Sequence, residues 1–135
     1  MSTCIEYSNN MARDNIFYYS HTGTYGCNLL PSSNTIIGLS TFPSKYNGPV
    51  RCVYYFLSPR QRVKLTFLYL DIMNADCSKD RIEIYDGFVT RVPSVRICNG
   101  NKVVEFMSSK QLVRMTYDGR SIGKYRGFHA EVTFL

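Results

Sequence analysis

The sequence predicts an all-β fold, a sandwich of two antiparallel sheets. Short stretches that alternate apolar and polar residues recur from residue 27 to the end of the chain, and turn residues separate them. Tyr and Phe are plentiful, at 11 and 8 residues, and no stretch keeps a helical period. A chain of 135 residues suits one domain with its own core. We expect that domain at residues 27–135, after a leader segment at residues 1–26 that lacks a clear period.

The first half of the domain contains three predicted strands. Residues 35–40 form a short strand, and residues 42–49 form a loop because two prolines exclude a central strand there. Residues 51–57 are rich in aromatic and β-branched types, which favour strands. Residues 61–70 alternate, so one face should carry Val63, Leu65, Phe67 and Tyr69, and the other Arg62, Lys64 and Thr66.

Residues 71–87 are the stretch that most constrains the function. They read as a strand end, an acidic loop containing Cys77, a short strand with Ile82 and Ile84 on one side, and an Asp86-Gly87 turn. The loop carboxylates either bind a cation or solvate a turn. Residues 94–98 repeat the alternation, and a turn follows at residues 99–101.

The last part of the chain contains two more predicted strands. Residues 111–117 form the first, and residues 118–126 form a polar, glycine-containing loop. In residues 127–135 the alternation places Phe128, Ala130, Val132 and Phe134 inward, and His129, Glu131 and Thr133 outward.

Cysteine usage indicates an oxidising, extracellular compartment. The chain has five cysteines, and none shows the C-x-x-C spacing of zinc sites. Five is odd, so Cys4 in the leader is expected to pair outside this chain, either with another part of a longer protein or with another molecule. The other four allow three pairings, between which the residues alone do not choose. No stretch is long enough to cross a bilayer.

The formal net charge of +6 favours acidic partners. Arg60, Arg62 and Lys64 on one strand, with Arg114 on another, are either an ordinary solvated sheet face or a patch for acidic protein or heparin-like glycan. Nucleic acid is not expected, because it needs clustered cations and stacking aromatics in a groove.

Enzyme motifs are missing from the sequence. The only histidines are His21, in the leader, and His129, and neither has a credible nucleophile or metal partner. The sequence contains no H-E-x-x-H, no G-x-S-x-G and no phosphate-binding glycine loop. A non-catalytic protein is expected.

Several motifs follow the order found in one extracellular family. Phe42-Pro43-Ser44-Lys45-Tyr46 precedes the second of the four cysteines and Leu70-Asp71-Ile72 the third. Cys77-x-x-Asp80, Tyr85-Asp86-Gly87 and a closing Gly127-Phe128-x-Ala130 follow. Together these features resemble a CUB domain, most like those of the suppressor-of-lurcher and neuropilin-tolloid-like group of CUB-rich cell-surface proteins.

The resemblance implies a jelly-roll-like sandwich with two disulfides, Cys27–Cys52 and Cys77–Cys98. It also implies the ligands of the family's calcium site: Tyr46, Asp80 and Asp118 match, but Met73 stands where a glutamate is expected. Calcium prefers hard oxygen ligands, which a thioether is not. Asp76 is a candidate substitute, whereas Arg120, Lys124 and Arg126 oppose cation capture by the Asp118 loop. We therefore expect no cofactor.

The resemblance also implies the function. We expect an extracellular or cell-surface module of a larger protein that binds another protein, in one version as an auxiliary or clustering partner of a receptor. The alternatives are a spermadhesin-like module that binds heparin-like glycan, and an accessory module of a secreted protease. The expected contact surface is formed by the loops at one end of the sandwich, with the residues Tyr46, Asp80, Asp118, Arg120, Lys124, Tyr125 and Arg126.

Overall fold

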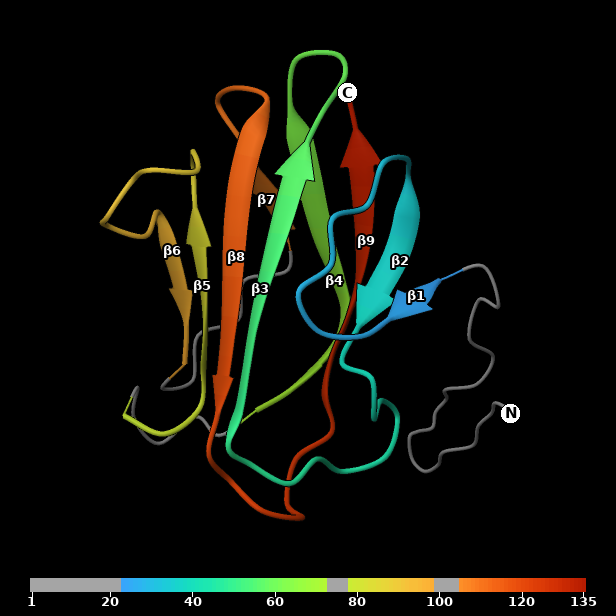
Figure 1. The fold of residues 1–135 in the computed structure, drawn as a ribbon, viewed down its shortest axis with the longest axis vertical. Coiled ribbons are helices and arrows are strands. Elements are labelled where there is room, and N and C mark those ends of the chain that lie inside the picture. Colours follow the sequence, from blue (N-terminus) through green and yellow to red (C-terminus); the bar gives the residue numbers. More distant parts are fainter. Residues whose placement is uncertain (1–22, 73–77, 99–104) are drawn as a thin grey trace.

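The computed structural model describes residues 23–72, 78–98 and 105–135. Within these ranges the regular structure is entirely β and forms two sheets that pack face to face (Figure 1). The described residues contain no helix with the length and apolar character that crossing a membrane requires. The predicted fold class is confirmed.

One sheet has five strands in the order β1-β2-β9-β4-β7, antiparallel except for the β1–β2 pair. Its two edge strands were not predicted, because they have two and three residues and are not part of a longer alternating stretch. The strands are β1 (Thr24–Tyr25), β2 (Thr35–Gly38), β9 (Gly127–Phe134), β4 (Val63–Asp71) and β7 (Glu105–Met107).

The other sheet has four antiparallel strands in the order β3-β8-β5-β6. All four were predicted, although β8 extends two residues past the predicted end at Tyr117. Residues 86–94 connect β5 to β6, so the Asp86-Gly87 turn opens a longer loop rather than a tight hairpin. The strands are β3 (Val50–Leu57), β8 (Leu112–Gly119), β5 (Arg81–Tyr85) and β6 (Val95–Ile97).

The core lies between the two sheets and is built from the inward residues of each strand. The four β9 residues predicted to face inward are buried, as are Ile82 and Ile84. Aromatic rings cross from sheet to sheet: the ring of Phe128 packs edge-on against Tyr54 and stacks on Tyr117. The strand pattern therefore specifies the core because every second residue is apolar.

A β-bulge at Leu68 corrects the prediction for Tyr69. The register pairs Phe67 with Ala130 but Tyr69 with His129, so β4 has one residue more than β9 at this point. Beyond the bulge the alternation is reversed. Tyr69 consequently lies on the outer face of the sheet and not on the core face of Phe67.

His129 corrects a second expectation. It lies on the outer face of β9 as predicted, yet it is only 5% exposed. The rings of Tyr25 and Phe42 pack edge-on against it, at 5.8 and 5.3 Å between centroids. Burial lowers the pKa of His129 to about 4, so its imidazole is neutral at physiological pH.

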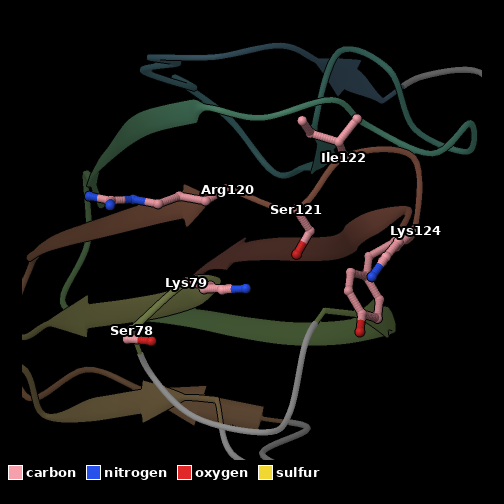
Figure 2. A pocket seen from close by; sticks show the side chains of 7 residues that line it. Ser78, Lys79, Arg120, Ser121, Ile122 and Lys124 are labelled. Carbon is pink, nitrogen blue, oxygen red and sulfur yellow. The ribbon is translucent and has the colours of Figure 1, made fainter.

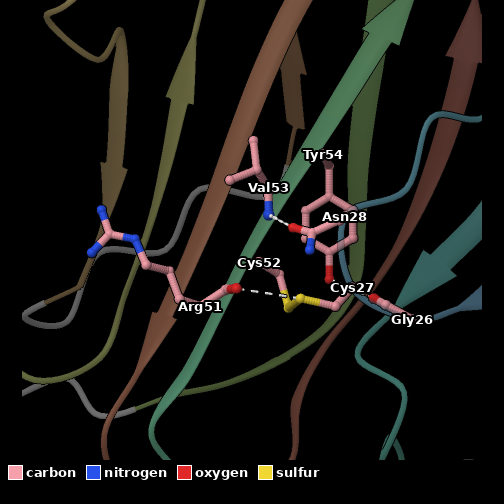
Figure 3. Close-up of a disulfide and its surroundings, with 7 residues drawn as sticks. All are labelled: Gly26, Cys27, Asn28, Arg51, Cys52, Val53 and Tyr54. Carbon is pink, nitrogen blue, oxygen red and sulfur yellow. Dashed lines mark hydrogen bonds between the residues drawn. A yellow bond between two sulfur atoms is a disulfide. The ribbon is translucent and has the colours of Figure 1, made fainter.

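The segment that begins at Cys27 covers the free edge of β3 (Figure 3). The disulfide Cys27–Cys52 ties the segment to the strand and confirms one predicted bridge. The amides of Val53 and Tyr55 donate to the Asn28 side chain and the Leu29 carbonyl, at 2.9 and 3.1 Å. These bonds satisfy groups that an edge strand would otherwise expose.

The remaining cysteines are placed only in part. Cys98 is buried and disulfide-bonded. Cys77 and Cys4 lie outside the described residues, so the expected Cys77–Cys98 bridge and the outside partner of Cys4 stay predictions.

Candidate functional site

The expected site residues come from three segments at one end of the sandwich, the lower end in Figure 1. The β2–β3 connection brings Tyr46, the residues before β5 bring Asp80, and the β8–β9 connection brings residues 120–126. The β3–β4 connection, residues 58–62, lies at the opposite end. We call residues 120–125 the loop end.

A buried carboxylate fixes the start of the loop end. Asp80 is fully buried, and its Oδ1 accepts the backbone amides of Arg120 and Ser121 at 2.8 and 3.1 Å. Its Oδ2 accepts the hydroxyl of Tyr46. Burial, followed by the hydrogen bond to Asp80, raises the pKa of Tyr46, so the phenol stays protonated and keeps donating.

Backbone hydrogen bonds hold the rest of the loop end against the segment around Tyr46. Tyr46 donates its amide to Tyr125 and accepts the amide of Gly123, at 3.0 and 2.9 Å. Gly48 donates to Ser121 at 2.9 Å, and a β-bridge joins Asn47 to Ile122. A Cβ on Gly48 would meet the Gly119 carbonyl at 2.6 Å, so this close approach requires glycine. The loop end is therefore a rigid platform.

Arg126 has a structural role in this arrangement. Its guanidinium donates to the Pro43 carbonyl at 2.8 Å, and its amide donates to Asp71 Oδ2 at 3.0 Å. Both bonds join the base of the loop end to neighbouring segments. Arg126 thus holds the predicted contact surface in place, and both of these donor groups are engaged within the protein.

Asp118 does not join Tyr46 and Asp80. It lies on the outer face of the four-stranded sheet, in one row with Arg51 and Arg81. Its carboxylate is 3.2 Å from Arg81 and 3.9 Å from Arg51. Asp118 is therefore neutralised by arginines, and its role is to hold β3, β8 and β5 together.

The described residues do not fit the expected calcium site. Of the three matching ligands, Tyr46 and Asp80 bond to each other while Asp118 faces arginines. Within the described ranges no three His, Cys, Asp or Glu side chains converge as a metal site would require. Met73 and Asp76 lie outside the described residues. The donors at Asp80 are instead neutral protein groups, which supply the contacts an ion would otherwise make.

A hollow of about 590 Å³ opens beside the loop end (Figure 2). Lys79 projects into it from the segment before β5, and Arg120 and Lys124 flank it. None of these three cations forms an ion pair with a described residue. No carboxylate is among the described residues that line it: Ser78, Lys79, Arg120, Ser121, Ile122, Lys124 and Tyr125.

A second hollow of about 500 Å³ lies on the other side of the loop end, toward β3. It is lined in part by Arg51, and it shares Arg120 and Ile122 with the first hollow. Ile122 is 67% exposed and stands between the two. Sequence reasoning missed Ile122, Lys79 and Arg51, although a single branched apolar residue in a polar loop was a readable signal for Ile122.

The structure does not assemble the basic face expected from Arg60, Arg62, Lys64 and Arg114. Lys64 lies on β4 and Arg114 on β8, strands of different sheets, so their outer faces point to opposite sides of the sandwich. Lys64 pairs with Glu105 at 3.3 Å. Arg114 donates to the Phe88 and Thr90 carbonyls at 2.6 and 3.0 Å and stacks on Tyr85. The prediction that Lys64 and Arg114 share one face was wrong, because alternation does not tell which sheet a strand joins.

Comparison with known proteins identifies the family. Residues 26–132 match the CUB domain, and the chain therefore belongs to the CUB domain family. CUB domains are typically extracellular interaction modules of larger proteins and are generally non-catalytic.

Three curated relatives are similar to this chain. Ovochymase-2 of Mus musculus is 26% identical over 87% of the chain, neuropilin-1 of Gallus gallus 30% over 73%, and embryonic protein UVS.2 of Xenopus laevis 32% over 64%. The matched part covers 20%, 12% and 18% of these relatives, respectively. The chain thus corresponds to one module of much longer proteins.

Two solved structures share the fold. The full extracellular region of zebrafish Gpr126/Adgrg6 matches 82% of this chain with a TM-score of 0.67 at 21% identity, and 15% of that chain is covered. The CUB2 domain of MASP-1 bound to Ca²⁺ matches 82% with a TM-score of 0.60 at 18% identity, and 99% of that chain is covered. Calcium is thus present in one structure of the same fold.

Proposed function

We propose that this chain is a non-catalytic module that binds another extracellular protein through the loop end. In this proposal it is part of a larger cell-surface protein that associates with a receptor in an auxiliary or clustering role. The observation that carries the proposal is the rigid, exposed and basic loop end with Lys79 beside it, since Lys79, Arg120 and Lys124 have no ion-pair partner among the described residues. Unpaired cations on a fixed backbone suit an acidic partner.

The likeness to neuropilin-1 and to the Gpr126/Adgrg6 extracellular region supports a place within a larger extracellular protein. The motifs shared with the suppressor-of-lurcher and neuropilin-tolloid-like group support the receptor-associated version. No cofactor is part of the proposal, since Asp80 is satisfied by Tyr46 and two loop amides.

A glycan-binding function has less support. A heparin-like chain needs a row of cations along one face. In this fold Lys64 and Arg114 lie on opposite faces and are engaged by Glu105 and by backbone carbonyls. The loop end presents a cluster of cations around an apolar residue instead, which suits a protein surface.

Binding of fluorescent tetramers of the domain to live cells of the source organism tests the proposal. The double variant Arg120→Glu/Lys124→Glu should reduce binding at least tenfold, because it reverses two cations on the platform. Arg60→Glu/Arg62→Glu is the matched control, since both side chains are exposed at the opposite end. It should bind like the unchanged domain.

Treatment of the cells separates a protein partner from a glycan. Trypsin should abolish binding and heparinase should leave it unchanged. Binding that survives the Arg120→Glu/Lys124→Glu change, or that heparinase removes, would contradict the proposal.

A further inference from the structure

We infer that Ile122 is the apolar anchor of the loop end, and that its partner is a protein surface with an apolar socket ringed by carboxylates. This inference rests on the proposed function and specifies the partner's chemistry. The observation behind it is the position of Ile122 between two hollows whose walls carry four cations: Arg51, Lys79, Arg120 and Lys124.

The surroundings of Ile122, and not its exposure alone, distinguish it. The side chain is 67% exposed, and other apolar side chains such as Leu30 and Val89 are exposed as well, but Ile122 lines both of the hollows that carry the cations. Its backbone nevertheless has a fixed position, because a β-bridge pairs it with Asn47 and the amides on either side donate to Asp80 and Tyr46. An aliphatic side chain on a backbone that is already fixed can be buried by a partner with little loss of conformational freedom, as an interface anchor requires.

The charges around Ile122 set the chemistry of the partner. Lys79 and Lys124 line the first hollow, Arg51, whose side chain is 73% exposed, lines the second, and Arg120 lines both. Lys79, Arg120 and Lys124 have no ion-pair partner among the described residues. Among the described residues, the one carboxylate that lines either hollow is Asp118, which Arg81 and Arg51 already neutralise. A partner that buries Ile122 must therefore place carboxylates around its apolar socket, or it would leave these cations opposite uncharged surface.

The same arrangement favours a protein over a sulfated glycan. A sulfated chain would engage the cations but gain nothing from an aliphatic side chain in their centre. Tyr125, which also lines the first hollow, adds a second apolar surface. An apolar centre within a charged rim is the usual anatomy of a protein interface.

Nuclear magnetic resonance with small probes tests the inference directly. The main probe is a blocked pentapeptide with leucine between two pairs of glutamates. There are three comparison probes. In one the leucine is replaced by glycine, in another the glutamates are replaced by glutamines, and the third is a heparin hexasaccharide.

The acidic leucine peptide should shift the Ile122 methyl signals and the amide signals of residues 120–124. The glycine peptide should bind at least fivefold more weakly, and the glutamine peptide should cause no shift.

Two outcomes with these probes would overturn the inference. One is equal binding of the leucine and glycine peptides, or no shift with the leucine peptide. The other is a hexasaccharide that shifts the same signals at lower concentration than the acidic leucine peptide.

The cell-binding assay separates this inference from the proposed function. Ile122→Ala should weaken cell binding about ten- to hundredfold, which is the loss of affinity expected when one large aliphatic side chain is no longer buried. Val89→Ala is the matched control, because Val89 is 90% exposed in the β5–β6 loop. If Arg120→Glu/Lys124→Glu abolishes binding while Ile122→Ala does not change it, the proposed function stands and the inference about Ile122 fails.

Discussion

At the scale of single residues, Asp80 organises the site. A buried carboxylate is tolerated when hydrogen bonds satisfy its oxygens, and Asp80 receives the Tyr46 hydroxyl and the amides of Arg120 and Ser121. The charge is thus stabilised by neutral donors, two of which belong to the loop it positions. Stability and site geometry depend on the same side chain.

We expect Asp80→Ala to lower the free energy of unfolding by about 3 kcal/mol, because it leaves two amides and a buried hydroxyl without acceptors. Asp80→Asn keeps an acceptor for the amides and should cost about 1 kcal/mol. Urea denaturation followed by circular dichroism measures both. Glu131→Ala, on the exposed side of β9, is the control and should change stability by less than about 0.5 kcal/mol. Equal stability of Asp80→Ala and the unchanged domain would contradict the assigned role.

His129 shows what a residue's neighbours decide. The alternation of β9 correctly places His129 on the outer face of the strand. Tyr25 and Phe42, which are distant in the sequence, nevertheless bury it. Tyr25 beside it has a pKa raised to about 12 by burial, so neither side chain is charged near neutral pH. The pair is an aromatic cluster and not a titratable surface.

At the scale of elements, the segment after Cys27 closes the sandwich at the edge of β3. The disulfide to Cys52 spans 25 residues and brings Asn28 and Leu29 to the strand's free amides. Without the covering segment, β3 would present a long edge to other chains. The bridge therefore protects an edge as well as restricting the unfolded chain.

Replacing both cysteines, Cys27→Ala/Cys52→Ala, should lower the free energy of unfolding by about 3 kcal/mol on the loop-entropy argument. Hydrogen exchange should show a local effect as well. The Val53 and Tyr55 amides, which donate to the covering segment, should lose more protection than the Tyr54 amide, which points toward β8 by strand alternation. The variant Asn28→Ala, with the disulfide intact, should accelerate exchange at Val53 alone. Uniform loss of protection along β3 in both variants would show that the segment does not cover the edge.

At the scale of the whole molecule, the distribution of charge opposes the capture of a calcium ion at the end of the sandwich where the family's ligands are expected. The net charge is +6, and the end of the sandwich that would hold the ion instead presents the cations Lys79, Arg120 and Lys124. Asp118, another candidate ligand, forms ion pairs with Arg81 and Arg51. The proposed platform is thus held by the protein's own groups.

We expect thermal unfolding to be the same in calcium and in EDTA. An ion at about 100 times its Kd would stabilise the folded state by about 2.7 kcal/mol, which is readily detected. Scanning calorimetry makes the measurement, with magnesium as the control for a general effect of divalent ions. A calcium-specific rise in Tm that Asp80→Asn removes would show that a site forms after all.

Much of the fold follows from the sequence because alternation has a fixed period. Seven of the nine strands in the described residues were predicted, from alternation or from strand-forming residue types, and alternation placed the core residues of β9 such as Phe128 and Val132. The exceptions have local causes that alternation does not contain. The bulge at Leu68 reverses the face of Tyr69, and the short strands β1 and β7 are not part of a longer alternating stretch.

The sequence by itself determined the family, the sandwich and the absence of enzyme motifs, since these depend on residue types in a fixed order. It also indicated that Tyr46, Asp80 and the 120–126 loop belong together. Only the tertiary structure decided that Asp118 faces arginines, that Lys64 and Arg114 lie on opposite sides, and that Ile122 stands exposed among cations. The physical reason is that period and spacing fix which face of its own strand a residue occupies. The sheet a strand joins, and the segments that cover it, depend on contacts between residues far apart in the chain.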